Sequence, residues 1–393
     1  MNLAILNEDV QQFIQENLDA DLAKLVFKKS VFNQVSSREL AEQIAGKKAV
    51  EKKLPRWFNT PGIYFPPKLA IEQSSSEQTA LYKSQIIPAE QVIDLTGGMG
   101  VDSFYFAQKA KEVYHVEQQT VLSAIAEHNA RMLGASNIQL IRDEAEHYLK
   151  NSSQNWDLIY LDPSRRIASQ KVFKLKDCEP NIVELQDGLL ERSRYILVKT
   201  APLLDIKSGL SELRKVREIH VLSLGNEMKE LLWLIDAEFD GDEPLIKCVG
   251  ISGQETKIFE FKLSEEKAFT LKKYSPIQNY LYEPNAAWLK AGCFKLLAQA
   301  YQVEKLHQHT HLYTSETLKP EFPGRQFQVI KQWTYKEFIR QKPISQANVM
   351  SRNFPLSVAE LKKKHHIKDG GMDYLLFYTN DKDELSVVQA IRV

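Results

Sequence analysis

Residues 92–104 read VIDLTGGMGVDSF and combine an apolar run with closely spaced glycines. An apolar run ends at Asp94, a turn with three glycines follows, and an amphipathic segment begins at Val101. This order is typical of a strand, a tight turn and a helix. Glycines let the backbone approach a ligand closely, and the start of a helix presents amide groups that a ligand can bind. The stretch therefore predicts a ligand-binding turn at the carboxyl end of a strand.

Strand and helix patterns alternate through residues 86–240. Apolar runs predict strands at 92–95, 112–117, 138–142, 156–161, 194–199, 218–224 and 230–236. Amphipathic segments separate the first six of them, which is typical of a parallel sheet covered by helices. A short connection at Gly225-Asn226 joins the last two, and this link is too short for a helical crossover. We therefore expect six parallel strands and an antiparallel seventh.

Acidic residues stand at the ends of four successive strands: Asp94, Glu117, Asp143 and Asp162. Open α/β sheets bind ligands at the carboxyl ends of their strands. Glu117 lies 23 positions after Asp94, the spacing at which a carboxylate binds a ribose diol. The third glycine of a dinucleotide motif is missing, and a G-x-x-x-x-G-K phosphate loop is absent. The residues therefore predict a site for a nucleoside-type cofactor.

The stretch 92–102 resembles motif I of class I S-adenosylmethionine-dependent methyltransferases, whose usual form is D-x-G-x-G-x-G. Thr96 replaces the first glycine of that motif, and Gly98 and Gly100 match the other two. The resemblance implies S-adenosylmethionine (SAM) as cofactor and a Rossmann-like seven-stranded sheet whose last strand is antiparallel. It also implies which residues contact the cofactor: Asp94, Thr96, Gly98 and Gly100 in the turn, Glu117 at the ribose and Asp143 at the adenine.

The whole chain is similar to bacterial methyltransferases that carry a C-terminal THUMP-like domain. The stretches that carry this similarity are EQSSSEQTALYKS (72–84), VIDLTGGMGVDSF (92–104), LDPSRR (161–166), LVKTAPLLD (197–205) and RNFPLSVAELKKKHHIKDGG (352–371). The similarity implies an N-terminal helical region (1–85), the methyltransferase domain (86–240), a strand-rich connector (241–275), a ferredoxin-like segment (276–318) and a THUMP-like domain (319–393). THUMP domains proper are RNA-binding modules of tRNA-modifying enzymes, so the resemblance implies tRNA or rRNA as substrate.

Asp162 and Pro163 are the expected catalytic residues. In relatives with D/N-P-P-Y, a carboxylate and a backbone carbonyl orient an amino group of the acceptor base while the aromatic residue stacks on it. Here Ser164 and Arg165 replace the second proline and the aromatic residue, which argues against amino-group methylation. Arg165 and Arg166 either bind RNA phosphate or stack on a base, or they form a salt-bridged pair.

Two further segments have open interpretations at this stage. Lys199, in LVKT, either faces the site or is an ordinary lysine at a strand end. The stretch 72–83 either closes over the cofactor or is a linker helix.

The formal net charge is zero, but the charges are segregated along the chain. Within 319–380 there are 11 basic and 5 acidic residues, which favours a polyanionic partner for the C-terminal end. Lys362, Lys363 and Lys364 follow an amphipathic segment and predict a phosphate-binding helix end, with a solvated helix end as the alternative.

Composition excludes several classes of protein. The chain has 393 residues, 43% of them hydrophobic and 26% charged, which is typical of a globular protein and not of a disordered one. No apolar run reaches the roughly 18–20 residues of a membrane helix, and the N-terminus lacks the pattern of a secretory signal. We therefore expect a cytoplasmic protein without a membrane partner, and the oligomeric state stays open.

No metal site is expected. The three cysteines, Cys178, Cys248 and Cys293, are widely spaced and match no zinc pattern. His307, His309 and His311 alternate as on one face of a strand, but no further ligand stands at metal-binding spacing. The aromatic residues Trp288, Trp333, Tyr335 and Phe338 are expected in the core.

Three functions remain at this stage. The first is an RNA methyltransferase. The second is a methyltransferase of a small molecule or protein that uses its C-terminal region as a lid or an oligomer interface. The third is a non-catalytic nucleic-acid binder with a degenerate pocket. The intact Asp94, Gly98, Gly100 and Glu117 argue against the third, and the basic C-terminal region favours the first.

Overall fold

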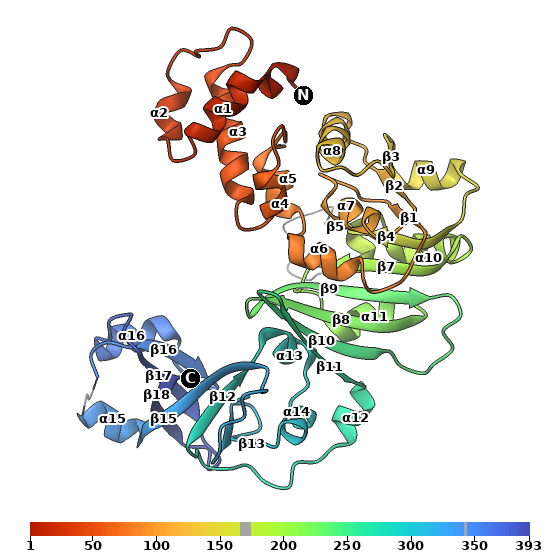
Figure 1. Cartoon of the computed structure of the whole chain (residues 1–393). Helices are drawn as coiled ribbons and strands as arrows, with labels where there is room; N and C mark the ends of the chain where they lie inside the picture. The colour runs from red at the N-terminus through yellow and green to blue at the C-terminus, as the bar shows by residue number, and fades with distance from the viewer. Residues whose placement is uncertain (166–173, 342–343) are drawn as a thin grey trace. The chain divides into compact units, whose positions relative to one another are not determined.

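The computed structural model describes residues 1–165, 174–341 and 344–393 (Figure 1). The chain folds as two compact units. The first comprises Met1–Arg217 and Leu231–Gly241, and the second comprises Glu218–Glu230 and Asp242–Val393.

The N-terminal region is helical, as predicted. Its elements are η1 (Leu3–Leu6), α1 (Glu8–Glu16), α2 (Leu22–Val26), α3 (Ser37–Val50), α4 (Pro55–Asn59), α5 (Lys68–Gln73) and α6 (Glu77–Lys83). The longest of them, α3, begins at a capping box in which Ser36 and Glu39 satisfy each other's backbone amides. Apolar side chains at helical spacing, among them Val10, Ile14 and Leu40, form a small core of their own.

The central sheet confirms the predicted Rossmann-like order. Its strands are β1 (Gln91–Asp94), β2 (Glu112–Val116), β3 (Ile138–Ile141), β4 (Trp156–Leu161), β7 (Ser193–Thr200), β8 (Val216–Leu224), β9 (Glu227–Asp236), β10 (Leu245–Ser252) and β11 (Glu255–Phe261). They lie in the order β11-β10-β8-β9-β7-β4-β1-β2-β3. β1 pairs in parallel with β2 and β4, whereas β9 is antiparallel to β7.

The sheet has nine strands, two more than predicted. β10 pairs in parallel with β8, and β11 turns back antiparallel on β10 through Gly253, whose φ is +60°. Both strands fall in the segment predicted as a connector (241–275), because their alternation shows that they are strands but not which sheet they join. Most side chains of β10 are buried or half-buried, so this strand needs a sheet neighbour.

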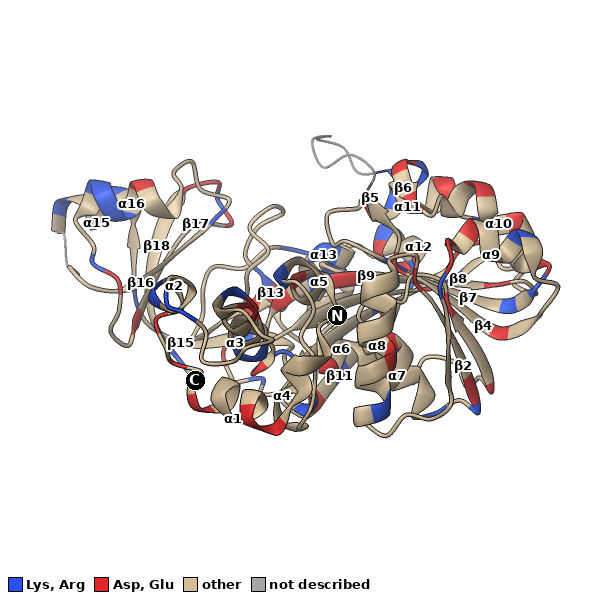
Figure 2. Cartoon of the chain, turned by 90° about the horizontal axis from the view of Figure 1, so that it is seen from above, with Lys and Arg blue, Asp and Glu red and all other residues tan. Residues whose placement is uncertain are grey.

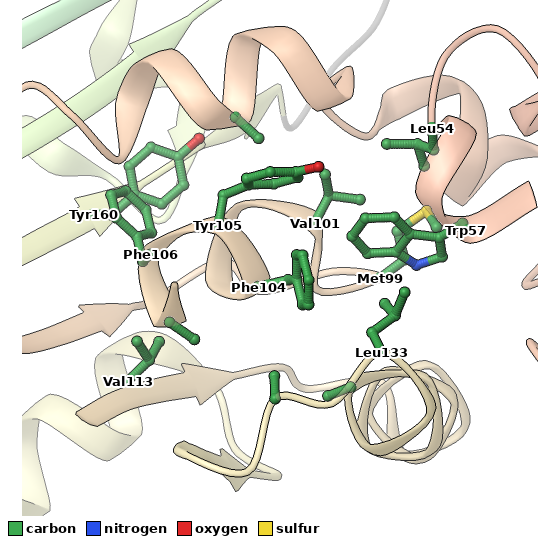
Figure 3. Packing of buried hydrophobic residues seen from close by; sticks show 14 of the residues in the cluster. Leu54, Trp57, Met99, Val101, Phe104, Tyr105, Phe106, Val113, Leu133 and Tyr160 are labelled. Atoms are coloured by element: carbon green, nitrogen blue, oxygen red, sulfur yellow. The ribbon is translucent and has the colours of Figure 1, made fainter. Parts of the chain in front are cut away.

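Helices connect the strands of the first unit: α7 (Val101–Ala107), α8 (Thr120–Met132), α9 (Ala145–Asn151), α10 (Ile182–Leu190) and α11 (Ile206–Glu212). A two-stranded ribbon of β5 (Ser164–Arg165) and β6 (Cys178–Glu179) follows β4, with η2 (Leu175–Asp177) just before β6. Figure 3 shows the core beside β1, where Trp57 of α4 packs edge-on against Phe104 of α7, with ring centroids 5.1 Å apart. This packing joins the N-terminal helices to the helix that follows the glycine turn.

The second unit contains a separate sheet and its helices. The strands are β12 (Tyr280–Pro284), β13 (Glu304–Lys305), β14 (Tyr313–Ser315), β15 (Gly324–Thr334), β16 (Asn348–Arg352), β17 (Asp373–Thr379) and β18 (Leu385–Arg392), in the order β13-β14-β12-β15-β18-β17-β16. The helices are α12 (Leu263–Ala268), α13 (Ala286–Ala291), α14 (Lys295–Ala300), α15 (Tyr335–Gln341) and α16 (Val358–His365). This arrangement confirms the predicted α+β C-terminal part.

The sequence pattern of residues 286–302 predicts a single helix, and the structure corrects this prediction. The segment 286–302 forms two helices, α13 and α14, because Gly292 adopts a left-handed φ of +78° and ends the first. The aromatic prediction is confirmed: Trp288, Trp333 and Phe338 are buried, and Tyr335 packs partly buried against the same core as Trp333 and Phe338. Within the described ranges, no helix is long and apolar enough to cross a membrane.

Candidate functional site

The glycine turn lies where β1 ends, between the parallel strands β2 and β4. Gly98 and Gly100 have φ values of +57° and +84°, a left-handed conformation that favours glycine. Gly97 needs its hydrogen side chain for another reason, because a Cβ there would lie 2.2 Å from the ring of His115 on β2. At Gly98 a Cβ would meet only the carbonyl oxygen of Thr96 at 3.8 Å, so this backbone has one open face.

Asp94 ends β1 with a buried carboxylate that is 1% exposed. It accepts hydrogen bonds from the Thr96 amide (3.0 Å) and the Ser103 hydroxyl (2.7 Å). Burial raises the pKa of Asp94 to about 7, and the charges of Asp102 and Asp162 raise it too, whereas the bond from Ser103 lowers it. The charge state of this side chain therefore changes near neutral pH.

Ser103 and His115 extend this contact into the core, and neither is among the residues that the sequence predicts for the site. The Ser103 hydroxyl lies 2.8 Å from Nδ1 of His115, whose ring is fully buried. Burial lowers the pKa of His115 to about 4, so the ring is neutral at pH 7. In the sequence, only their positions indicate a role at the site. Ser103 lies one helical turn past the glycines, and His115 lies two residues before Glu117.

Glu117 follows β2 and is oriented by the backbone of two turns. Its carboxylate accepts hydrogen bonds from the amide of Gly98 (3.0 Å) and from the amide of Gln119 (2.7 Å). Asp143, after β3, lies 2.8 Å from Nδ1 of His147 and is half-exposed. A fixed carboxylate beside an open glycine backbone fits a ribose diol next to the turn, and Asp143 offers an acceptor for an adenine amino group. The residues present therefore fit SAM.

Asp162 and Lys199 form an ion pair at the ends of the neighbouring parallel strands β4 and β7. The backbone amide of Asp162 donates to the Thr96 hydroxyl at 2.7 Å, which joins the end of β4 to the glycine turn. The side chain of Asp162 is 32% exposed and that of Lys199 is 13% exposed, so solvent reaches the pair. Of the two interpretations of Lys199, the structure supports the one in which this lysine faces the site.

Pro163 is buried, and β5 begins directly after it. The backbone of Arg165 pairs with Cys178 of β6. Arg166 lies outside the described residues.

A second lysine–aspartate pair lies beside the first. Lys83 of α6 is 0% exposed, and its ammonium lies 2.7 Å from Oδ1 of Asp102 in the first turn of α7. The other oxygen of Asp102 accepts from the hydroxyls of Ser75 (2.7 Å) and Tyr160 (3.0 Å). Burial alone would raise the pKa of Asp102, but the charges of Lys83 and Lys199 outweigh it and hold that pKa below its usual value.

The stretch 72–83 is thus fastened to the glycine turn by a buried charge pair. The sequence alone does not determine the role of this stretch, because the partner of Lys83 stands 19 positions further on and only the fold brings them together.

The three basic residues 362–364 lie in the second unit, in the last turn of α16 (Figure 2). They differ in their surroundings. Lys362 pairs with Asp369 at 2.5 Å, Lys364 lies over the ring of Tyr335 at 5.4 Å, and Lys363 is exposed. One of the three predicted phosphate contacts therefore has a competing carboxylate.

The histidines 307, 309 and 311 lie between β13 and β14 and not on a strand, so they do not share a strand face. Nowhere in residues 1–165, 174–341 and 344–393 do three His, Cys, Asp or Glu side chains gather as they would around a metal ion.

Comparison with known families agrees with this geometry. The sequence model of SAM-dependent methyltransferases matches residues 73–176, from α6 through the glycine turn to β4 and beyond. A ferredoxin-like model matches residues 280–323, and a THUMP-like model matches residues 324–390. The chain belongs to the SAM-dependent methyltransferases. The cofactor of this family is SAM.

One protein of known structure is similar to this chain along its whole length. A crystal structure from Porphyromonas gingivalis W83, named as that of a methyltransferase, is 29% identical, has a TM-score of 0.88, and is matched over 100% of this chain and 98% of that one. An uncharacterized SAM-dependent methyltransferase of Mycobacterium tuberculosis is 22% identical over 68% of this chain and 70% of its own length. An uncharacterized RNA methyltransferase of Streptococcus mutans is 29% identical over 32% of this chain, and the match spans only 31% of that relative.

Proposed function

We propose that this methyltransferase modifies a base in structured RNA, either tRNA or rRNA. The observation that carries the proposal is that a THUMP-like stretch and a SAM-dependent methyltransferase stretch stand in one chain. THUMP domains bind RNA, and a basic C-terminal region suits a polyanion. Relatives named as RNA methyltransferases support the proposal, among them a 23S rRNA (uracil(1939)-C(5))-methyltransferase of Aeromonas hydrophila that is 30% identical over 35% of this chain and 33% of its own length.

In this proposal the carboxyl edge of the first unit's sheet holds the cofactor and the acceptor side by side. Glu117 binds the ribose, Asp143 binds the adenine amino group, and the turn with Asp94, Thr96, Gly98 and Gly100 holds the methionine part. When bound, SAM supplies a methyl group on a positively charged sulfur. Asp162 and Pro163 orient the acceptor, because they end the strand next to the turn and Asp162 is tied to Thr96. Holding two reactants in line supplies most of the catalysis in such a transfer.

We further propose that Arg165 and Arg166 contact RNA near the acceptor and that Lys362, Lys363 and Lys364 contact phosphates elsewhere on it. Lysine and arginine bind RNA phosphates through charge, and the affinity then falls as salt rises. Since Lys362 already pairs with Asp369, we expect Lys363 and Lys364 to contribute more.

A small-molecule acceptor is the second candidate. A cobalt-precorrin-6B C(15)-methyltransferase of Methanobrevibacter smithii is 30% identical over 35% of this chain and 67% of its own length. In that case the C-terminal region serves as a lid or an oligomer interface.

Labelled methyl transfer from SAM separates the two candidates. The full chain is incubated with total RNA from a strain of the source organism that lacks the gene, and nucleosides are analysed by mass spectrometry. We expect one methylated base in tRNA or rRNA, and a product formed with a precorrin but with no RNA would contradict the proposal. Asp162→Ala should abolish most turnover while cofactor binding by calorimetry persists, because the proposed role of Asp162 is to orient the acceptor.

A further inference from the structure

The Asp162–Lys199 pair constrains the chemical class of the acceptor. One carboxylate oxygen of Asp162, Oδ2, is engaged by the Lys199 ammonium. An exocyclic amine that is to be methylated offers two hydrogens, which a carboxylate and a backbone carbonyl accept in amine-methylating sites. Here an ammonium lies where part of that acceptor capacity would be needed.

The charge of Lys199 also favours one kind of transition state. An amine nitrogen gains positive charge as a methyl group is added, and a neighbouring ammonium opposes this change. An acidic O–H or ring N–H loses its proton and gains negative charge, which a fixed ammonium stabilises. Lys199 is held at this point by its ion pair with Asp162, its side chain is 13% exposed, and its charge also acts on Asp102.

A carbon atom of a base fits this site less well as the methyl acceptor. An uncharged pyrimidine ring needs a thiolate nucleophile to activate its carbon, and all three cysteines of this chain are fully buried. Burial raises the pKa of the Cys248 and Cys293 thiols well above the usual range.

We propose that the methylated group of the base is an acidic one that gives up a proton: the ring N–H of a guanine or uracil in RNA. This inference rests on the proposed RNA function and narrows it. The acceptor passes its proton to the other oxygen of Asp162, and its electron pair forms the new bond to the methyl carbon. The old carbon–sulfur bond breaks and leaves its electron pair on the sulfur, so the sulfonium charge disappears as one proton is released. Lys199 stabilises the negative charge that develops on the acceptor and stays protonated.

The test uses the full chain with SAM and the total RNA of the deletion strain. The parent should yield a ring-nitrogen product such as 1-methylguanosine or 3-methyluridine. Lys199→Met should lower the single-turnover rate about 10²- to 10³-fold. Its rate should keep rising to higher pH than that of the parent, because the acceptor loses its proton less readily without the ammonium. Lys199→Arg keeps the positive charge and should retain much more activity.

Lys111→Met is the matched control, because Lys111 forms a similar pair with Glu90 at the opposite end of the strands. It should leave the rate unchanged. Calorimetry with S-adenosylhomocysteine should give the same affinity for the parent and Lys199→Met, which shows that the variant is folded and that Lys199 acts on the acceptor side.

An exocyclic product, such as N6-methyladenosine or N2-methylguanosine, would overturn the inference and leave the RNA function intact. A Lys199→Met rate that falls with no change in its pH profile would also overturn it, since Lys199 would then only hold Asp162 in place. If no RNA nucleoside is methylated at all, the proposed function fails, and the inference fails with it.

Discussion

Two lysine–aspartate pairs lie at the same edge of one sheet, and they differ in what surrounds them. Lys83 and Asp102 are enclosed, and two hydroxyls complete the contacts of the aspartate. The side chains of Lys199 and Asp162 reach solvent, with 13% and 32% of them exposed. A buried pair whose partners are all protein groups fixes a position, whereas a pair with an accessible carboxylate can receive a substrate. The same two residue types therefore serve as a structural clamp in one place and as a proposed reaction site in the other.

The largest effect on stability is expected when the enclosed Lys83–Asp102 pair is broken. Lys83→Met leaves the Asp102 carboxylate buried without its ammonium, and removing one partner of such a pair costs about 3–5 kcal/mol of stability. Calorimetry on the full chain should show the first unit melting at a markedly lower temperature. The double variant Lys83→Met with Asp102→Leu removes both charges and should recover much of the loss.

The stability loss of Lys83→Met is compared with that of Lys199→Met. The loss in Lys199→Met should be much smaller, because the side chain of Asp162, the partner of Lys199, is a third exposed. Equal destabilisation by the two lysine variants would contradict the distinction between clamp and reaction site.

The next effect concerns Asp94. Besides burial, the charges of Asp102 and Asp162 raise the pKa of its carboxyl group. Burial is the largest cause, and it places the pKa at about 7 against an ordinary value of 3.8. The folded protein thus holds a proton that the unfolded chain has lost between about pH 4 and pH 7, and the free energy of unfolding falls as pH rises through that window. Asp94→Asn carries no such charge, so its stability relative to the parent should increase by on the order of a few kcal/mol from pH 4 to pH 7.

Denaturant melts at a series of pH values measure this difference. His115, whose pKa is lowered by burial, titrates in both proteins and cancels in the comparison. A constant difference between parent and variant would show that Asp94 does not change its charge in this window.

A smaller effect is expected on the affinity for the cofactor, from a substitution that leaves both lysine–aspartate pairs intact. Glu117→Ala removes the carboxylate that we propose to bind the ribose, and hydrogen bonds to a charged group contribute roughly 1.5–3 kcal/mol. The affinity for SAM should fall about ten- to a hundredfold in calorimetry. Glu112→Ala, at the other end of the same strand, should leave the affinity unchanged. An unaltered affinity in Glu117→Ala would place the ribose elsewhere.

Much of this arrangement can be predicted from the sequence, because it depends on short-range patterns. The strand, turn and helix of residues 92–104 follow from apolar runs and glycines, and the acids at strand ends follow from counting to the end of each run. Lys83, Ser103 and His115 could not be assigned a role this way, since each acquires its partner only through the fold. The two additional strands were missed for the same reason, because alternation identifies a strand but not its neighbour.

The smallest expected effect concerns a third lysine–aspartate pair, the most exposed of the three. Lys362 shares its charge with Asp369, whereas Lys363 and Lys364 have no carboxylate partner among the ion pairs that the structure gives for the described residues. If α16 contacts RNA phosphates, each lost contact should reduce the slope of log affinity against log salt by about 0.7 on single strands. Lys363→Ala with Lys364→Ala should therefore flatten the slope more than Lys362→Ala does, and SAM binding should not change, because its proposed residues all lie in the other unit. Filter binding of structured cellular RNA across a salt series measures this, with Lys382→Ala, on the turn between β17 and β18, as the control. Identical slopes for the parent and the double variant would mean that α16 ends in solvent and that RNA, if bound, is held elsewhere.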